Sequence, residues 1–189
     1  MKKIWIVLIV VGIVILALAG RLIQGLNTAV ILDEKVNQAW AQVENQLQRR
    51  NDLIPNLVST VKGYMTHEKE TFTKITELRS QWAQAKSTEQ KIQTANQITD
   101  TLSRLLLVAE NYPELKANQN FLTLQAQLEG TENRIAVERM RYNQAVQGFN
   151  TYQRTVFGRL FTSLRGLVKP RVYFEAEEGV KDVPVVEFE

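Results

Sequence analysis

The hydrophobic positions of this 189-residue chain follow two different patterns. Residues 4–20 form an uninterrupted uncharged run, preceded by Lys2 and Lys3 and closed by Arg21. From Val36 onward, apolar residues instead recur at alternating steps of three and four, the period of a helix face that packs on other helices. The sequence therefore predicts one apolar N-terminal helix followed by a series of amphipathic helices.

The apolar run has the length of a short membrane span. Its 17 residues would extend about 25 Å as a helix, against a hydrocarbon core of about 30 Å. Ala17-Leu18-Ala19 also resembles the small-residue cleavage site of a signal peptide. However, Leu22, Ile23 and Leu26 continue the apolar helix, and Trp5 lies where interfacial aromatic residues occur. We therefore predict a membrane anchor at residues 1–25, with its span at about 4–20, and a cleaved signal peptide as the alternative.

The first amphipathic stretch has apolar residues at eight of nine face positions, and Arg50 occupies the ninth. Pro55 falls inside this pattern, removes one backbone hydrogen bond and crowds the preceding turn, so we expect a helix kink there rather than an end. Gly63 and Thr66 mark the end of the stretch, and Thr66 is a candidate N-cap for the next helix. The nine face positions are Val36, Trp40, Val43, Leu47, Arg50, Ile54, Leu57, Val61 and Tyr64.

Three further helices are predicted along the rest of the chain. The second covers about residues 68–86, the third begins at the capping box that Ser87 and Gln90 form and ends before Pro113, and the fourth follows Asn118 to about residue 156. Short loops between amphipathic helices favour an up-down arrangement. The predicted fold class is all-α: an N-terminal transmembrane helix followed by an antiparallel four-helix bundle with long helices, at residues 26–157.

Composition and charge narrow the function classes. The net charge of +3 is small and dispersed, so nucleic acid is not an expected partner. The chain has no cysteine and one histidine, His67, without the second histidine of a zinc protease motif. No glycine-rich phosphate loop or catalytic triad is recognisable. We therefore expect no metal, no cofactor and no enzymatic activity.

Arg50 requires an acceptor if it lies on a buried helix face, because an unpaired buried guanidinium is too costly to persist. In an antiparallel bundle with Arg21 and Phe157 at one end, the level of Arg50 falls near residue 128, about one turn from Glu132. We therefore predict a bidentate pair of Arg50 with Glu132 as a structural polar contact. A polar groove for a ligand or partner peptide is the alternative.

The C-terminal part, residues 158–189, combines a basic amphipathic segment with an acidic tail. Between Arg154 and Phe174 there are five basic residues and no acid, whereas residues 175–189 contain six acids and one lysine. A basic helix with Phe and Leu on one side is typical of a membrane-surface element. The alternative is that it packs on the end of the bundle or on a neighbouring subunit. The candidate membrane-surface residues are Phe157, Arg159, Leu160, Phe161, Leu164 and Arg165.

Several long strings occur in a fixed order along the chain. They are AWAQV at 39–43, QLQRRNDLIPNLV at 46–58, VKGY at 61–64, YPELKANQNF at 112–121, LEGTENRIA at 128–136, RYN at 141–143 and YFE at 173–175. These strings resemble the LemA family, and the match extends over roughly residues 1–175. The resemblance implies a bacterial membrane protein with one N-terminal span and a four-helix domain, of a family without an established biochemical activity.

Two functional hypotheses remain. The first is a membrane-anchored helical scaffold of the bacterial cell envelope that forms a homo-oligomer and organises or remodels membrane lipid or client proteins. The second, suggested by the family resemblance, is an accessory or adaptor subunit of an envelope protease or stress-response membrane complex. Basic residues before the span favour a cytoplasmic N-terminus of a single-pass inner-membrane protein, with the bundle on the extracytoplasmic side.

Overall fold

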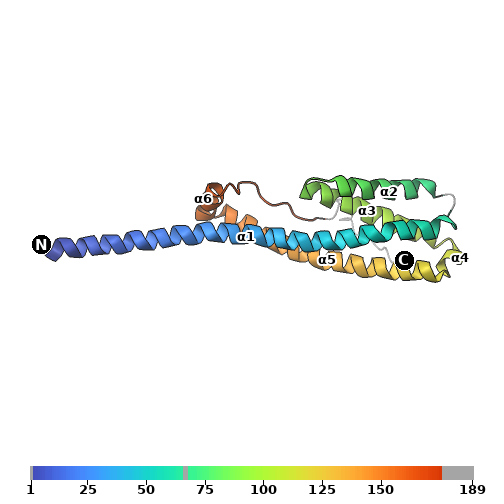
Figure 1. Cartoon of the computed structure of the whole chain (residues 1–189), viewed down its shortest axis with the longest axis horizontal. Helices are drawn as coiled ribbons and strands as arrows, with labels where there is room; N and C mark the ends of the chain where they lie inside the picture. Colours follow the sequence, from blue (N-terminus) through green and yellow to red (C-terminus); the bar gives the residue numbers. More distant parts are fainter. Residues whose placement is uncertain (1, 66–67, 176–189) are drawn as a thin grey trace, which may run out of the picture. The chain divides into compact units, whose positions relative to one another are not determined.

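The computed structural model describes residues 2–65 and 68–175. Within these ranges all regular secondary structure is helical, and no strand occurs. The helices are α1 (Lys2–Lys62), α2 (Lys69–Gln84), α3 (Thr88–Ala109), α4 (Pro113–Lys116), α5 (Gln119–Arg154) and α6 (Val156–Leu164) (Figure 1). The all-α class is thus confirmed for the described part of the chain, whereas the antiparallel four-helix bundle remains a prediction. Thr66, His67 and most of the acidic tail lie outside the described residues.

The helix boundaries differ from the sequence-based ones in two places. The predicted anchor and the first amphipathic stretch are one helix, α1, which continues through residue 26 and through Pro55. The loop predicted at residues 113–117 contains the short helix α4, which has Pro113 in its first turn, where a missing N–H costs nothing. The kink at Pro55 stays a prediction, but the helix does not stop there.

Two compact units can be distinguished. Unit 1 comprises residues 2–41 and 141–171, and unit 2 comprises residues 42–140 and 172–175, without residues 66–67. Each of the long helices α1 and α5 contributes one part to each unit.

The core of unit 2 is built from the predicted apolar faces. Helices α2 and α3 pack on each other. At the start of α3, the Ser87 hydroxyl accepts from the Gln90 amide at 3.2 Å, while the Gln90 side chain accepts from the Lys86 amide at 3.0 Å. Asn118 caps α5 by accepting from the amides of Asn120 and Phe121. The buried positions include Val43, Leu47, Ile54, Leu57 and Val61 of α1, Phe72, Ile75 and Leu78 of α2, Ile92, Ile98, Leu102 and Leu105 of α3, and Phe121, Leu128 and Ile135 of α5.

Unit 1 has a smaller core between the N-terminal part of α1 and the C-terminal part of α5. Val36 of α1 is buried, as are Val146 and Phe149 of α5. The rings of Trp40 and Tyr142 lie 5.3 Å apart, centroid to centroid. This core fixes the end of α5 from which α6 begins.

Helix α6 is closed at both ends by local hydrogen bonds. The Thr155 hydroxyl accepts from the Gly158 amide at 3.0 Å, which caps the N-terminus. At the C-terminus Gly166 has a φ of 73°, and the Leu167 amide donates to the Thr162 carbonyl at 2.8 Å, the pattern of a Schellman motif. These caps let a helix of nine residues form although it is too short to be stable by itself.

Candidate functional site

The apolar N-terminal part of α1 is a candidate membrane span. Among the described residues it is the one helix long and apolar enough to cross a membrane. Its large apolar side chains between Ile4 and Leu18 have exposed fractions of 48% to 74%. Such a long exposed apolar surface requires cover by something other than water.

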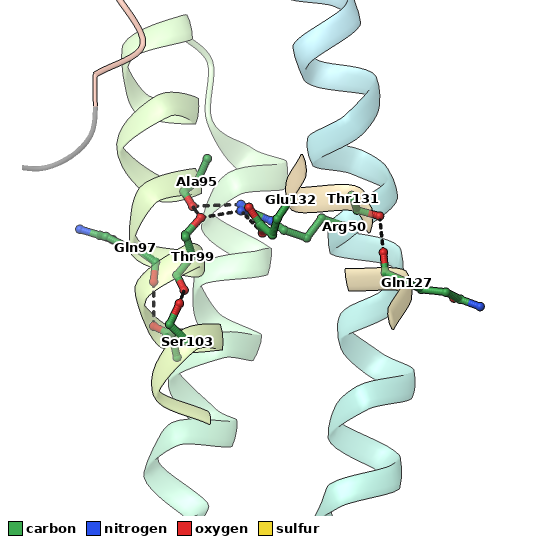
Figure 2. Close-up of polar contacts among 9 residues, drawn as sticks. Arg50, Ala95, Gln97, Thr99, Ser103, Gln127, Thr131 and Glu132 are labelled. Carbon is green, nitrogen blue, oxygen red and sulfur yellow. Dashed lines mark hydrogen bonds and ion pairs between the residues drawn. The ribbon is translucent and has the colours of Figure 1, made fainter. Parts of the chain in front are cut away.

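Arg50, on α1 in unit 2, is the most deeply buried charged residue described, with 1% of its surface exposed. Its Nη1 donates to Glu132 Oε1 at 3.0 Å and to the Thr99 hydroxyl at 2.7 Å, and its Nη2 donates to the Ala95 carbonyl at 2.9 Å (Figure 2). Burial lowers the pKa of Arg50, and the attraction of Glu132 opposes this shift. Both terminal nitrogens of the guanidinium thus have acceptors on α3 and α5, whereas its buried Nε has no hydrogen-bond partner among the described residues.

The structure therefore brings Arg50 and Glu132 together, but not in the bidentate geometry expected from the sequence. One guanidinium nitrogen contacts one carboxylate oxygen, because the second nitrogen is turned to the Ala95 carbonyl. The Glu132 side chain keeps 35% of its surface exposed. The carboxylate is only partly desolvated, so the acceptors on α3 stabilise the Arg50 guanidinium as much as Glu132 does.

Pro55 has a specific consequence one turn earlier in α1. Proline has no N–H, so the carbonyl of Asn51, four residues before, lacks its helical donor. Arg79 of α2 supplies a replacement, because its Nε donates to the Asn51 carbonyl oxygen at 3.1 Å. The proline thus opens a backbone acceptor that joins α1 to α2, a link that the sequence pattern did not predict.

The side chain of Asn51 is an unusual feature of the same turn. Only 2% of this residue is exposed, yet neither its amide nitrogen nor its amide oxygen has a hydrogen-bond partner among the described residues. Buried polar atoms are nearly always hydrogen-bonded, because desolvation otherwise costs about 1 to 3 kcal/mol each. Asn51 therefore places a buried amide group in the core without a hydrogen bond.

A pocket of about 420 Å³ lies beside the Arg50 network within unit 2. Phe174, which is buried, borders it, and the Arg139 guanidinium lies 5.7 Å from the centre of the Phe174 ring. The Asn96 side chain donates to the Glu175 carbonyl at 2.9 Å. The C-terminal segment thus docks at the pocket, and the terminal nitrogens of Arg50 are satisfied within the chain.

Helix α6 in unit 1 has an exposed apolar face. Val156, Phe157, Leu160 and Leu164 are 85%, 70%, 52% and 61% exposed. Arg159 and Arg165 are exposed as well. Five of the six candidate membrane-surface residues, all but Phe161, are thus available to a partner.

Phe161 differs from the other candidates, because its ring lies against Gly25 of α1. A Cβ atom at position 25 would come within 2.1 Å of the Phe161 ring. The hydroxyl of Tyr152, whose pKa is raised by burial, donates to the Gly25 carbonyl at 2.8 Å. Gly158 and Thr162 are buried on the same side of α6. Phe161 therefore holds α6 on α1, and the lack of a side chain at Gly25 makes room for it.

The segment after α6 is held by contacts that the sequence did not reveal. The amide group of Asn150 both donates to the Arg171 carbonyl and accepts from the Arg171 amide, each at 2.8 Å. Arg171 Nε donates to Asp33 of α1 at 3.0 Å. Arg171 thus has an acidic partner far away in sequence, whereas no acid is adjacent to it in the chain.

Within residues 2–65 and 68–175, no group of three His, Cys, Asp or Glu side chains is placed to hold a metal ion. His67 lies outside these ranges. The described residues form an all-helical arrangement with an exposed apolar N-terminal helix, a buried arginine held by acceptors from two other helices, and a basic amphipathic helix.

Comparison with known proteins gives the family. The LemA family model matches residues 39–188, so the chain belongs to the LemA family. A curated relative, Protein LemA of Metamycoplasma hominis, is 25% identical over 118 residues, which are 62% of this chain and 54% of the relative. The chain thus spans about half the length of that relative.

Proposed function

We propose that this protein is a membrane-anchored helical scaffold of the bacterial cell envelope, which assembles with copies of itself and organises membrane lipid or client proteins. The exposed apolar part of α1 carries the proposal. Burying it in a bilayer removes a surface that would aggregate in water. Family membership supports the same direction, since the family resemblance implies a bacterial membrane protein with one N-terminal span.

Self-assembly is the second part of the proposal. Val137 and Met140 lie one turn apart on α5 in unit 2, and 43% and 56% of their surfaces are exposed. A pair of exposed apolar side chains on a long helix suits a contact between copies, although single exposed apolar residues are common on surfaces. The four-helix arrangement of the bundle belongs to this proposal, because its long helices provide such lateral surfaces.

The proposed orientation follows from the charges beside the span. Lys2 and Lys3 precede the apolar run, and Arg21 follows it. The positive-inside rule then favours a cytoplasmic N-terminus in the inner membrane and extracytoplasmic helices.

Purification of the full chain in mild detergent tests this function. We expect a symmetric homo-oligomer by native mass measurement, and we expect its dissociation on replacing both Val137 and Met140 with lysine. Leu107 of α3, 66% exposed, provides the control Leu107→Lys, which should leave the assembly intact. A monomer bound to a stoichiometric foreign subunit, such as a membrane protease, would favour the adaptor hypothesis instead.

The membrane anchor has its own test. N-terminal sequencing should find residues 1–20 in the mature protein, and alkaline carbonate should leave the protein in the membrane fraction. A mature N-terminus at Gly20 would show that the run is a cleaved signal peptide.

A further inference from the structure

We infer that α6 lies in the lipid–water interface beside the span of its own chain, with Phe157, Leu160 and Leu164 inserted among the lipid acyl chains. The inference deepens the proposed function and rests on its membrane anchor. It assigns α6 a partner of defined chemistry, the surface of an anionic bilayer.

The position of α6 along α1 is the first step. Phe161 and Tyr152 both contact Gly25, and Gly25 follows Gly20, the last residue of the apolar run, by five positions. At about 1.5 Å per helical residue, Gly25 lies about 7.5 Å beyond the end of the span. The headgroup layer extends about 5 to 7.5 Å beyond the hydrocarbon core on each side. The contact that holds α6 is therefore inferred to lie at the outer edge of the headgroup layer.

The two faces of α6 give the second step. Phe161 packs against Gly25 of α1, Gly158 lies against the Tyr152 carbonyl at the end of α5, and Thr162 is buried, so this face is largely covered within unit 1. Phe157, Leu160 and Leu164 recur at steps of three and four on another face and are more than half exposed. Because the first face is already covered by α1 and the end of α5, the second face is left for a different partner.

Charge identifies that partner. Arg159 and Arg165 flank the apolar row and are exposed, and Lys169 follows it. No acidic residue occurs between Arg154 and Phe174, so this surface complements anionic lipid headgroups, where each basic residue contributes about 1 kcal/mol. A helix with an apolar row and basic flanks is the usual form of an interfacial helix.

The absence of cysteine from the natural chain permits a direct test with single nitroxide labels in the full-length protein. Cysteine replaces Phe157 or Leu164 in α6, Ile13 in the span, or Ile31, which is exposed on α1 eleven residues beyond Gly20. Each variant is reconstituted in vesicles of phosphatidylglycerol and phosphatidylcholine. Collision rates with oxygen, which concentrates in lipid, and with a water-soluble nickel chelate are then compared.

We expect the ratio of oxygen to nickel collisions at positions 157 and 164 to lie above that at position 31 and to approach that at position 13. Arg159→Glu together with Arg165→Glu should lower the ratio at position 157. Arg134→Glu, which alters an exposed arginine of unit 2, should not lower it.

Three outcomes would overturn the inference. A ratio at 157 and 164 equal to that at 31 would place α6 in water, and shielding of both labels from both reagents would show that another copy covers the row. In either case a lipid-like ratio at 13 would leave the proposed anchor standing. A water-like ratio at 13 would remove the anchor, and the inference with it.

Discussion

The Arg50 network of unit 2 and the α6 surface of unit 1 each contain side chains whose polarity does not match their surroundings. Arg50 is a charge inside a core, and acceptors on α3 and α5 surround it. Phe157 and Leu160 are apolar side chains that stay 70% and 52% exposed. The comparison shows that the terminal nitrogens of a buried charge find their acceptors within the chain, while the apolar row of α6 stays more than half exposed.

The largest effect is expected from replacing Arg50, the buried charge itself. We expect Arg50→Met to lower the free energy of unfolding by about 3 kcal/mol, the low end for a buried pair, because Glu132 is partly solvated. Urea unfolding of the detergent-solubilised protein, followed by circular dichroism, measures the change. Arg49→Met alters the exposed neighbour and should have little effect.

Replacing Glu132 separates its contribution to stability from that of the acceptors on α3. From the sequence, Glu132→Gln is expected to resemble Arg50→Met. The structure indicates a smaller loss, about 1 to 2 kcal/mol, because Arg50 keeps the Ala95 carbonyl and the Thr99 hydroxyl. Equal losses for Glu132→Gln and Arg50→Met would show that the carboxylate alone stabilises the guanidinium.

In unit 1, the contact between Phe161 and Gly25 can be disrupted in the same way. Gly25→Leu should displace Phe161, since even a Cβ atom clashes with its ring, and should increase hydrogen exchange of the α6 amides by mass spectrometry. Gly20→Leu is the matched control, because a Cβ at position 20 meets nothing within 4 Å. Unchanged α6 exchange in Gly25→Leu would mean that the N-cap and Schellman motif hold the helix without this contact.

A double-mutant cycle tests whether Arg79 compensates for Pro55. Arg79→Met alone should destabilise by about 1 kcal/mol, since it leaves the Asn51 carbonyl without a donor. In a Pro55→Ala background, the backbone at position 55 regains an N–H for that carbonyl, so Arg79→Met should cost less. Additive losses in urea unfolding would contradict the coupling.

The smallest effect is expected at Asn51. Its amide atoms are buried without partners, so Asn51→Leu should leave the protein as stable or raise its unfolding free energy by up to about 1 kcal/mol. The melting temperature by circular dichroism measures this. A clear loss of stability would show that the amide is hydrogen-bonded in solution.

Local pattern alone determined much of this protein. The uncharged run predicts an exposed apolar helix, and the three-four spacing predicts the buried faces of α1, α2, α3 and α5, because helical periodicity is a property of consecutive residues. Arg50 stands out in the same way, as a charge on an apolar face. The counting argument from helix rise brought Glu132 within one turn of it.

Tertiary structure alone decided which distant groups meet. That Arg50 turns one nitrogen to Ala95, that Arg79 donates to the carbonyl opened by Pro55, and that Arg171 finds Asp33 all depend on how segments pack. Phe161 shows the same limit, because its spacing matches the exposed row of α6 and only the missing side chain of Gly25 turns it inward. Such contacts join residues far apart in sequence, and local periodicity contains no information about which of them approach.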